Sequence, residues 1–529
     1  SCLLSMKTGR PVKMNYTREQ VFLFSRARHQ FKHTLTTGVK KDGTLMALTN
    51  ECYLEGGAYA SFGIATVYYA GSLLGAPYRL PHMKYDGYRI YTNRPACGAQ
   101  RGHGGVAARA AWEQQIDFIA EELGMDPVEI RLKNSMEAGD VTCNEFNTSS
   151  FGMKECIEAV KDGSQWNQKK GKMAEGKGIG VACGFFVSGA GYPIYRSETA
   201  HSTVVIKLSE DGGTAHVLTG SAEIGQGSDT AMAMIAAEAL GVPLDHIKVS
   251  SGDTDYSVDL GAYSSRQTLM TGHATKQAAE DLKRQVLEVL GDKIKISTDR
   301  MDIKKGYIVF TDETPDFSIL RTIYAKEHRG FRDNPDPDEP LTFREAARMA
   351  YLSRGSMVGT GSYKPGDLGG KFKGATVGTS PAYGPSAQVV EVTVDKGTGK
   401  VIIDRMTDAH DCGFAINRTS VEGQMQGSLS MGLGEAMFEE VKFDDKGRIL
   451  NANLAEYKIP TALDMPNVDT IIVESNEPNG PFGAKEVGEG AIMPTIPAIL
   501  NAVYDAVGVK IHELPLTPER VFMAIQEKE

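Results

Sequence analysis

The chain has 529 residues, of which 41% are hydrophobic and 23% are charged, so it can form roughly two to four domain-sized units without disulfide bonds. Its net charge is −10 and no cluster of Lys and Arg stands out, which argues against a nucleic-acid-binding protein. No apolar run reaches the roughly 18 residues that a membrane span needs, and no signal peptide is visible.

The seven cysteines are odd in number and widely spaced, and they include no Cys-x-x-Cys pair. This usage indicates a reducing compartment, so we expect a cytoplasmic protein. Iron–sulfur clusters need closely spaced thiolates, and the chain lacks a dinucleotide-binding fingerprint. We therefore expect neither an iron–sulfur cluster nor a flavin on this chain.

The first part of the chain predicts strands followed by helices. Residues 1–8 read as the end of an apolar helix closed by Gly9, so we expect the chain to begin inside a domain. Alternating patterns over residues 34–94 predict strands. After a glycine-rich loop, an apolar stripe ending at Gly124 predicts a helix, and Asp126 caps a second one.

A polar stretch at residues 162–176 predicts a linker, which divides the chain into residues 1–160 and residues 176–529. The second part mixes hairpins and helices, which favours an α+β fold with mixed sheets and two subdomains over a doubly wound parallel sheet. The expected segments are a hairpin at 202–219, helices at 228–240, 271–290 and 493–507, helices opening at Thr342 and after Gly423, strands at 387–395 and 401–406, and an exposed loop at 331–340.

Two glycine-rich loops before helices are candidate anion sites. Gly225-Gln226-Gly227 precedes a helix, where free amide groups and the helix dipole favour negative charge. The alternative is an ordinary strand–turn–helix connection. The loop Gly102–Gly105 is similar and has Arg101 beside it; His103 within it can equally be an ordinary loop histidine.

Two further segments carry side chains with specific chemistry. Ser264, Ser265 and Arg266 precede a long helix, and their hydroxyl and guanidinium groups suit a phosphate or diphosphate, although a surface arginine on a capped helix is the alternative. Glu489 lies between two glycines just before an apolar helix. A carboxylate pressed towards a core can have a raised pKa and act as a base, whereas a solvated turn glutamate would not.

Two other glycine runs do not predict nucleotide sites. Gly176-x-Gly178-x-Gly180 resembles part of a dinucleotide fingerprint, but a strand-like run follows it instead of a helix. Gly369-Gly370-Lys371 lacks the spacing of a phosphate-binding loop.

The order of the motifs is more specific than any one of them. The succession is Lys7-Thr8-Gly9-Arg10-Pro11-Val12, Thr17-Arg18-Glu19, Arg101-Gly102-x-Gly104, Glu223-x-Gly225-Gln226-Gly227, Asn417 to Gly423-Gln424, and Lys485-x-Val487-Gly488-Glu489. It resembles the molybdenum-binding subunits of the xanthine oxidase and aldehyde oxidase family over the whole chain. The chain also resembles the 4-hydroxybenzoyl-CoA reductase branch of this family at residues 188–193, at residues 261–266 and at His103.

The resemblance implies a fold and a set of site residues. Residues 1–160 would be the C-terminal part of a first molybdenum-cofactor-binding domain, and residues 176–529 a second. Glu489 matches the family's catalytic base, Arg18 an active-site arginine and His103 a substrate-facing position. Positions expected to bind the cofactor are Arg101, Gly102, Gly225, Gln226, Gly227, Ser264, Ser265, Arg266, Gln424, Lys485 and Gly488.

The resemblance also implies cofactors and partners. The molybdenum would be held by the dithiolene of a pyranopterin near Arg101 and Glu489, not by protein side chains, and the loop at Ser264 suits the cytosine dinucleotide form. FAD and 2Fe–2S clusters would lie on partner subunits. The family's Phe-Gly-Gly loop precedes the segment at Lys7, so either a partner chain carries it or the sequence is a fragment.

Three functions remain open at this point. The first is a reductive dehydroxylation of an aryl-CoA, as in 4-hydroxybenzoyl-CoA reductase. The second is hydroxylation of an N-heterocycle, purine or aldehyde with water as the oxygen source. The third is a scaffold or maturation protein without cofactor, against which Glu489, Gln226 and Arg101 together argue.

Overall fold

The computed structural model describes residues 1–190, 200–311, 317–327, 339–366, 368–370 and 375–528. The strands in these ranges form three mixed sheets and one two-stranded antiparallel sheet, which, with the helices, confirms the predicted α+β fold. The three larger sheets have the strand orders β1-β2-β3, β10-β5-β6-β7 and β13-β12-β11-β4, and β8 pairs with β9. The pairs β2–β3, β6–β7 and β12–β13 are parallel, and the others are antiparallel.

The strands among the described residues are β1 (Phe31–Val39), β2 (Leu45–Gly57), β3 (His82–Tyr91), β4 (Lys177–Val187), β5 (Ser202–Leu208), β6 (Ala215–Thr219), β7 (Ile247–Ser250), β8 (Met301–Lys304), β9 (Tyr307–Phe310), β10 (Val358–Tyr363), β11 (Tyr383–Asp395), β12 (Lys400–Asp411) and β13 (Asn467–Val473).

The α-helices are α1 (Cys2–Thr8), α2 (Arg18–Phe24), α3 (Gly63–Ser72), α4 (Gly105–Leu123), α5 (Pro127–Asn134), α6 (Met153–Gly163), α7 (Trp166–Lys169), α8 (Ser228–Leu240), α9 (Gly272–Ile294), α10 (Phe317–Glu327), α11 (Phe343–Arg354), α12 (Arg418–Met437), α13 (Thr495–Val507) and α14 (Pro518–Lys528).

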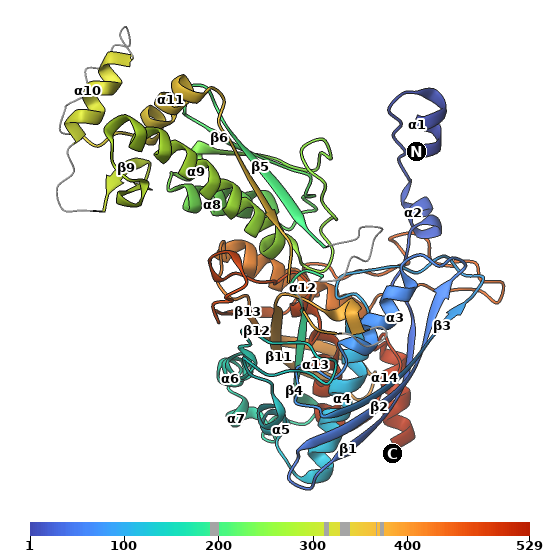
Figure 1. The fold of residues 1–529 in the computed structure, drawn as a ribbon. Coiled ribbons are helices and arrows are strands. Elements are labelled where there is room, and N and C mark those ends of the chain that lie inside the picture. The colour runs from blue at the N-terminus through green and yellow to red at the C-terminus, as the bar shows by residue number, and fades with distance from the viewer. Residues whose placement is uncertain (191–199, 312–316, 328–338, 367, 371–374, 529) are drawn as a thin grey trace.

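Two hydrophobic cores account for most of the buried apolar side chains. One joins residues 45–187 to residues 377–525 around the β4–β11–β12–β13 sheet. The other lies within residues 204–357, where α8, α9 and α11 cover the β5–β6 sheet in the upper left of Figure 1. The first core continues across residues 162–176, because Trp166 in that stretch is fully buried. A shared core on both sides of this stretch does not decide where one domain ends, so the division into residues 1–160 and 176–529 stays a prediction.

Local capping signals predicted several boundaries correctly. Helix α11 begins at a capping box between Thr342 and Glu345, and Asp126 caps α5 through two backbone amides. Gly124, Gly241 and Gly508 follow α4, α8 and α13 in the left-handed conformation that closes a helix.

Other predictions were wrong. The region 34–94 is not all strand, because α3 interrupts it; eight of the ten residues of α3 are buried, so no apolar–polar period marks it as a helix. Helix α12 begins at Arg418, before Gly423, because the side chain of Asn417 caps it. The predicted loop at 331–340 lies largely outside the described residues.

Helix α13 is buried and apolar. Together with the short turn before it, α13 forms the stretch Gly490–Val507, which is the one stretch among the described helices with the length and composition of a membrane span. However, 78% of this stretch is buried inside the protein. Together with its packing on β4 and β11, this identifies α13 as a core helix.

Two glycines of β4 explain how α13 packs so closely. A Cβ atom at Gly180 would lie 2.2 Å from the backbone nitrogen of Ala502 and 2.5 Å from the carbonyl oxygen of Ala498. A Cβ atom at Gly178 would lie 2.2 Å from the carbonyl oxygen of Ala502. The glycine run that resembles a nucleotide fingerprint therefore lets a helix backbone lie directly against the strand.

Gly180→Ala is expected to destabilise the protein, because the new methyl group meets backbone atoms of α13 that cannot move aside alone. We expect a loss of roughly 1–3 kcal/mol in the free energy of unfolding, as for other overpacked cores. The unfolding midpoint in urea measures it. Gly366→Ala is the matched control, since a Cβ there meets no atom within 4 Å. Equal midpoints for the two variants would contradict the close packing.

Candidate active site around Glu489

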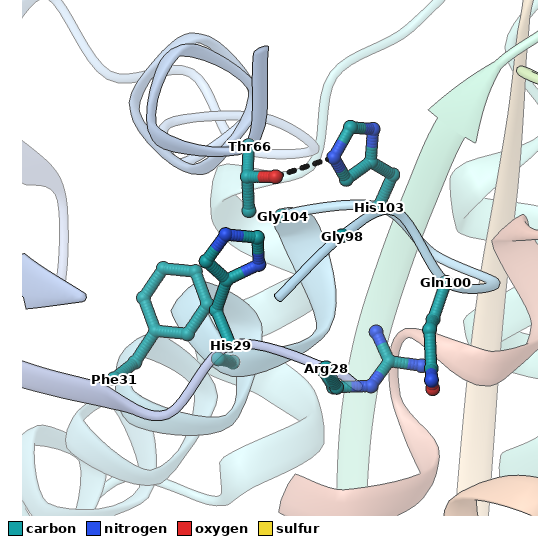
Figure 2. Close-up of a pocket in the computed structure, with 9 residues that line it drawn as sticks. Arg28, His29, Phe31, Thr66, Gly98, Gln100, His103 and Gly104 are labelled. Carbon is teal, nitrogen blue, oxygen red and sulfur yellow. Dashed lines mark hydrogen bonds between the residues drawn. The ribbon is translucent and has the colours of Figure 1, made fainter. Parts of the chain in front are cut away.

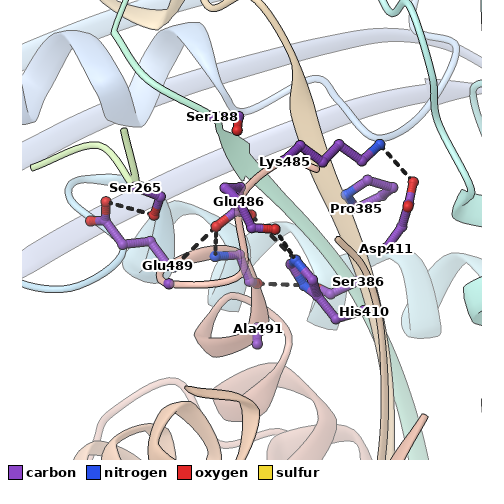
Figure 3. A network of polar contacts seen from close by, with 12 residues as sticks. Ser188, Ser265, Pro385, Ser386, His410, Asp411, Lys485, Glu486, Glu489 and Ala491 are labelled. Atoms are coloured by element: carbon purple, nitrogen blue, oxygen red, sulfur yellow. Dashed lines mark hydrogen bonds and ion pairs between the residues drawn. The ribbon is translucent and has the colours of Figure 1, made fainter. Parts of the chain in front are cut away.

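The carboxylate of Glu489 is held by two loops that are distant in the sequence. Its Oε1 accepts a hydrogen bond from the backbone amide of Gly102 at 3.0 Å. Its Oε2 accepts one from the hydroxyl of Ser265 at 3.2 Å, as Figure 3 shows. Burial raises the pKa of Glu489, and the two hydrogen bonds and the charge of Arg101 oppose this only in part. A part-buried carboxylate with a raised pKa can accept a proton near neutral pH.

Arg101 joins the base loop to α12. Its Nε donates to the carbonyl oxygen of Gly488, and one terminal nitrogen donates to both the carbonyl oxygen and the side-chain oxygen of Gln424, each at 2.9 Å. The planar guanidinium thereby fixes three chain segments in one place. The structure thus brings together six of the predicted site residues: Glu489, Arg101, Gly102, Ser265, Gln424 and Gly488.

The Ser264–Ser265 turn is a strained part of the site. Both residues have positive φ, 55° and 47°, in the left-handed region that side chains disfavour. Such residues cost about 1–3 kcal/mol each and occur where the surroundings hold them. Here the hydroxyl of Ser264 contacts the hydroxyl of Tyr69 at 2.9 Å, and its carbonyl oxygen accepts the amide of Gly189. In this backbone conformation the hydroxyl of Ser265 donates to Glu489.

His103 lines a small cavity behind the Gly98–Gly105 loop, shown in Figure 2. Its Nε2 lies 2.6 Å from the hydroxyl oxygen of Thr66. Burial lowers the pKa of His103 to about 3, so its ring is neutral at physiological pH. The cavity is lined by Arg28, His29, Phe31, Thr66, Gly98, Gln100, His103, Gly104 and Ala107.

Arg18, Arg266 and Lys485 lie outside the contacts around Glu489. Arg18 is exposed on α2, which Figure 1 shows on an arm apart from the body. The buried guanidinium of Arg266 pairs with Asp259 at 2.8 Å and donates to the backbone and side chain near β5. Lys485 pairs with Asp411 at 2.7 Å, with both side chains fully buried. In this structure Arg266 and Lys485 form buried ion pairs that link separate segments of the fold.

The amides of the Gly225-Gln226-Gly227 loop already have an anionic partner. The carboxylate of Glu223 accepts hydrogen bonds from the amides of Gly225, Gly227 and Asp229. Burial raises the pKa of Glu223, but these bonds outweigh it and the net shift is downward. A phosphate of a cofactor at this helix terminus would have to replace that carboxylate.

Glycines leave open space next to the cluster. A Cβ at Gly423 on α12 or at Gly225 would meet no atom within 4 Å. One at Gly427 would lie 3.3 Å from a terminal nitrogen of Arg101, and one at Gly227 would lie 3.3 Å from the hydroxyl of Ser420. Backbone amide groups beside open space suit a flat polar ring that carries an anionic group, such as a pterin with a phosphate.

No group of three His, Cys, Asp or Glu side chains in the described ranges is arranged to hold a metal ion. The positive charge of Arg101 beside the Glu489 loop suits an anionic ligand at this site.

Sequence reasoning missed several residues of the cluster. Glu486 lies in the same segment as Glu489, and its carboxyl group contacts the backbone of Glu489 and Gly490. The feature of the sequence that could have indicated Glu486 is a second carboxylate in the Lys-Glu-Val-Gly-Glu segment. Tyr69 lies in an apolar stretch and His410 in a polar run at the end of β12, and each reaches the site only through the fold.

The raised pKa of Glu489 predicts an acid limit on activity. If the carboxylate form is the active base, kcat/KM rises with pH and its acid limb has an apparent pKa above the ordinary value of a glutamate. Ser265→Ala removes a hydrogen bond to the charged form, which raises the pKa and moves the limb to higher pH. The exposed Ser362→Ala is the control. A limb that stays in place or moves to lower pH would contradict this assignment.

Models for a molybdopterin cofactor-binding domain match residues 1–135 and residues 155–466. The chain is 34% identical, over 98% of its length, to a putative xanthine dehydrogenase molybdenum-binding subunit of Escherichia coli K12, and spans 65% of that protein. Its structure is similar to quinoline 2-oxidoreductase from Pseudomonas putida 86, with a TM-score of 0.86 and 26% identity over 99% of this chain and 66% of the other.

The aldehyde oxidoreductase of Desulfovibrio gigas is also similar, with a TM-score of 0.78 and 27% identity over 99% of this chain and 52% of that one. The chain therefore spans about half to two thirds of the length of these relatives. Arg101 lies in the first matched region and Gln424 in the second, whereas the Glu489 segment follows the second.

Proposed function

This chain belongs to the xanthine dehydrogenase and aldehyde oxidoreductase family of molybdopterin-binding proteins, and we propose that it is the molybdenum-cofactor subunit of a hydroxylase. Its substrate would be an aldehyde, a purine or an N-heterocycle, and water would supply the oxygen. The observation that carries this is the Glu489 carboxylate, held by Gly102 and Ser265 next to the contact of Arg101 with α12, where a Cβ at Gly423 would meet no atom within 4 Å.

The cofactor, when bound, supplies the redox centre. The chain's own residues prepare the site for it. Glu489 accepts a proton, and Ser265 orients the oxygen that does so. Arg101 fixes the base loop and places a positive charge near the anionic cofactor. Gln424 and Gly488 hold the guanidinium in that orientation.

The aryl-CoA reductase hypothesis has less support. The relatives reported above are named for xanthine, quinoline and aldehyde substrates. His103, on which that hypothesis partly relied, is neutral and buried against Thr66. Hydroxylation, the alternative from the sequence, therefore agrees better with the observations.

We further propose partner subunits with 2Fe–2S clusters and FAD, and a cytosine dinucleotide form of the cofactor. Although Phe22 packs against Tyr457, the arm of α1 and α2 supports a covering partner or a further segment, because several other apolar side chains on it are exposed. They include Leu3 at 73%, Met6 at 82% and Phe24 at 69%. The seven cysteines are all free, which supports a cytoplasmic location.

Turnover of the purified complex in water enriched in oxygen-18 tests the proposal. Aldehydes, purines, N-heterocycles and 4-hydroxybenzoyl-CoA are offered in parallel, with an electron acceptor or donor as each reaction needs. A hydroxylase places the heavy oxygen in its product. Turnover of the aryl-CoA alone, with loss of its hydroxyl group, would establish the reductase instead.

A further inference from the structure

Glu486 occupies a closed slot directly beneath the candidate base. Its side chain is fully buried. Its Oε2 accepts the backbone amides of Glu489 and Gly490, both at 3.2 Å. Figure 3 shows the Glu486 carboxyl between the base loop and His410 of β12. One carboxyl oxygen therefore holds two successive peptide groups at the residue proposed to transfer the proton.

The slot fits this carboxyl because glycines surround it. A Cβ at Gly384 on β11 would lie 2.5 Å from Oε1 of Glu486, and one at Gly490 would lie 2.2 Å from it. The Nε2 of His410 lies 2.8 Å from the main-chain oxygen of Glu486 and 3.6 Å from Oε1. The backbone and the side chain of Glu486 are thus both fixed by the sheet.

We propose that Glu486 is a positioning residue, whose carboxyl group fixes the backbone at Glu489 and Gly490 and so holds the base against the Gly102 and Ser265 contacts. The inference rests on the proposed function, because it assigns a purpose to the position of Glu489. Glu486 itself does not reach the open space in which a cofactor and substrate would lie. It acts through the peptide groups that it binds.

The charge state of Glu486 suits this role. Burial raises its pKa to about 8, and the neighbouring Glu489 carboxylate adds to the shift. His410 on β12 is neutral, since burial lowers its pKa to about 4, and Arg101 supplies the positive charge from the other loop. Below pH 8 Glu486 is mainly protonated. It accepts hydrogen bonds without placing a second negative charge beside the base.

The experiment compares Glu486→Gln with Glu486→Ala in the holoenzyme complex. Glutamine is nearly isosteric, and its side-chain oxygen can still accept both amides. Alanine leaves both amides unpaired. We expect Glu486→Ala to lower kcat by about 10²-fold through misplacement of the base, with KM changed less than about threefold. Glu486→Gln should recover most of kcat and leave the acid limb of kcat/KM in place.

Hydrogen exchange of the peptide spanning residues 484–492 is the second readout, and it needs no turnover. The amides of Glu489 and Gly490 should exchange faster in Glu486→Ala and at the native rate in Glu486→Gln. Glu391→Gln is the control, because it makes the same chemical change at a buried carboxyl group of β11 that pairs with Lys169. If the complex proves not to be a hydroxylase, the exchange rates still decide whether Glu486 holds the loop.

Three outcomes would overturn the inference. Glutamine as harmful as alanine would mean that the carboxyl group itself is needed. A shift of the acid limb to lower pH in Glu486→Gln would mean that Glu486 acts through negative charge. Native turnover and native exchange in Glu486→Ala would mean that it does not position the base. If Glu486→Ala does not fold, the acid limb and exchange of Glu486→Gln still decide between these outcomes.

Discussion

Glu489→Gln is expected to lower turnover by about 10²–10⁴-fold, the usual effect of losing a general base. The fold should survive, because a glutamine oxygen can still accept the amide of Gly102, and its amide nitrogen can donate to the hydroxyl of Ser265. Turnover at saturating substrate and molybdenum per chain are measured on the same preparation. We expect native metal content with very low activity.

Glu345→Gln is the matched control. It makes the same chemical change in the capping box of α11, within the other hydrophobic core, and glutamine also serves in a capping box. Near-native turnover of Glu489→Gln at full molybdenum content would remove Glu489 as the base. Loss of molybdenum along with activity would instead assign it to cofactor binding.

Arg131→Met is expected to have the largest effect on stability. The guanidinium of Arg131 lies 2.8 Å from the Glu113 carboxylate and 2.6 Å from the Asp117 carboxylate, and all three side chains are buried. Removing the cation leaves Asp117 without its ion-pair partner and Glu113 with Arg109 alone, at 3.7 Å, in the core that supports α4, α5 and β4. Breaking such a buried pair costs about 3–5 kcal/mol.

The pH dependence of this variant follows from the same contacts. Burial already raises the pKa of Asp117 to about 6 with Arg131 present, and without the cation it rises further. A carboxyl group with a raised pKa in the folded state contributes stability at low pH and loses it as pH rises. Unfolding midpoints of Arg131→Met should therefore approach the wild-type value at pH 5 and fall well below it at pH 8.

Arg284→Met is the comparison for Arg131→Met. Arg284 pairs with Asp281 and Glu288, but its side chain is 58% exposed, so we expect a change of about 0–1 kcal/mol. A loss for Arg131→Met as small as that for Arg284→Met, at both pH values, would show that the buried cluster does not stabilise the fold.

The sequence was sufficient to predict those features of the fold that depend on residues close together in the chain. Helix ends at Asp126, Thr342 and Gly508 could be identified because capping groups and helices are neighbours in the chain. The buried helix α3 could not, because a helix without a polar face has no detectable period. The strand that follows Gly176 was expected, but the use of its glycines as a seat for α13 depends on a contact with residues far along the chain.

The candidate site was predictable where a motif holds its own geometry. Glu489, Gly488, Gly102 and Arg101 do meet in the structure. Arg266 shows the limit, because a guanidinium near two serines suited a phosphate, whereas its partner is Asp259, a carboxylate seven residues earlier. Glu486 shows the opposite limit. Nothing in the sequence distinguishes a carboxyl buried beneath a loop from one exposed beside it.

The contact between Arg101 and Gly488 joins residues 387 positions apart. A ribosome makes a chain from its N-terminus, so the Arg101 loop and the strands β4 and β11 are synthesised before the base loop and α13. Until α13 docks, β4 and β11 lack the helix that packs on them, and the Arg101 loop lacks its carboxylate. The nascent protein therefore exposes an apolar sheet for an interval in which it needs protection from aggregation.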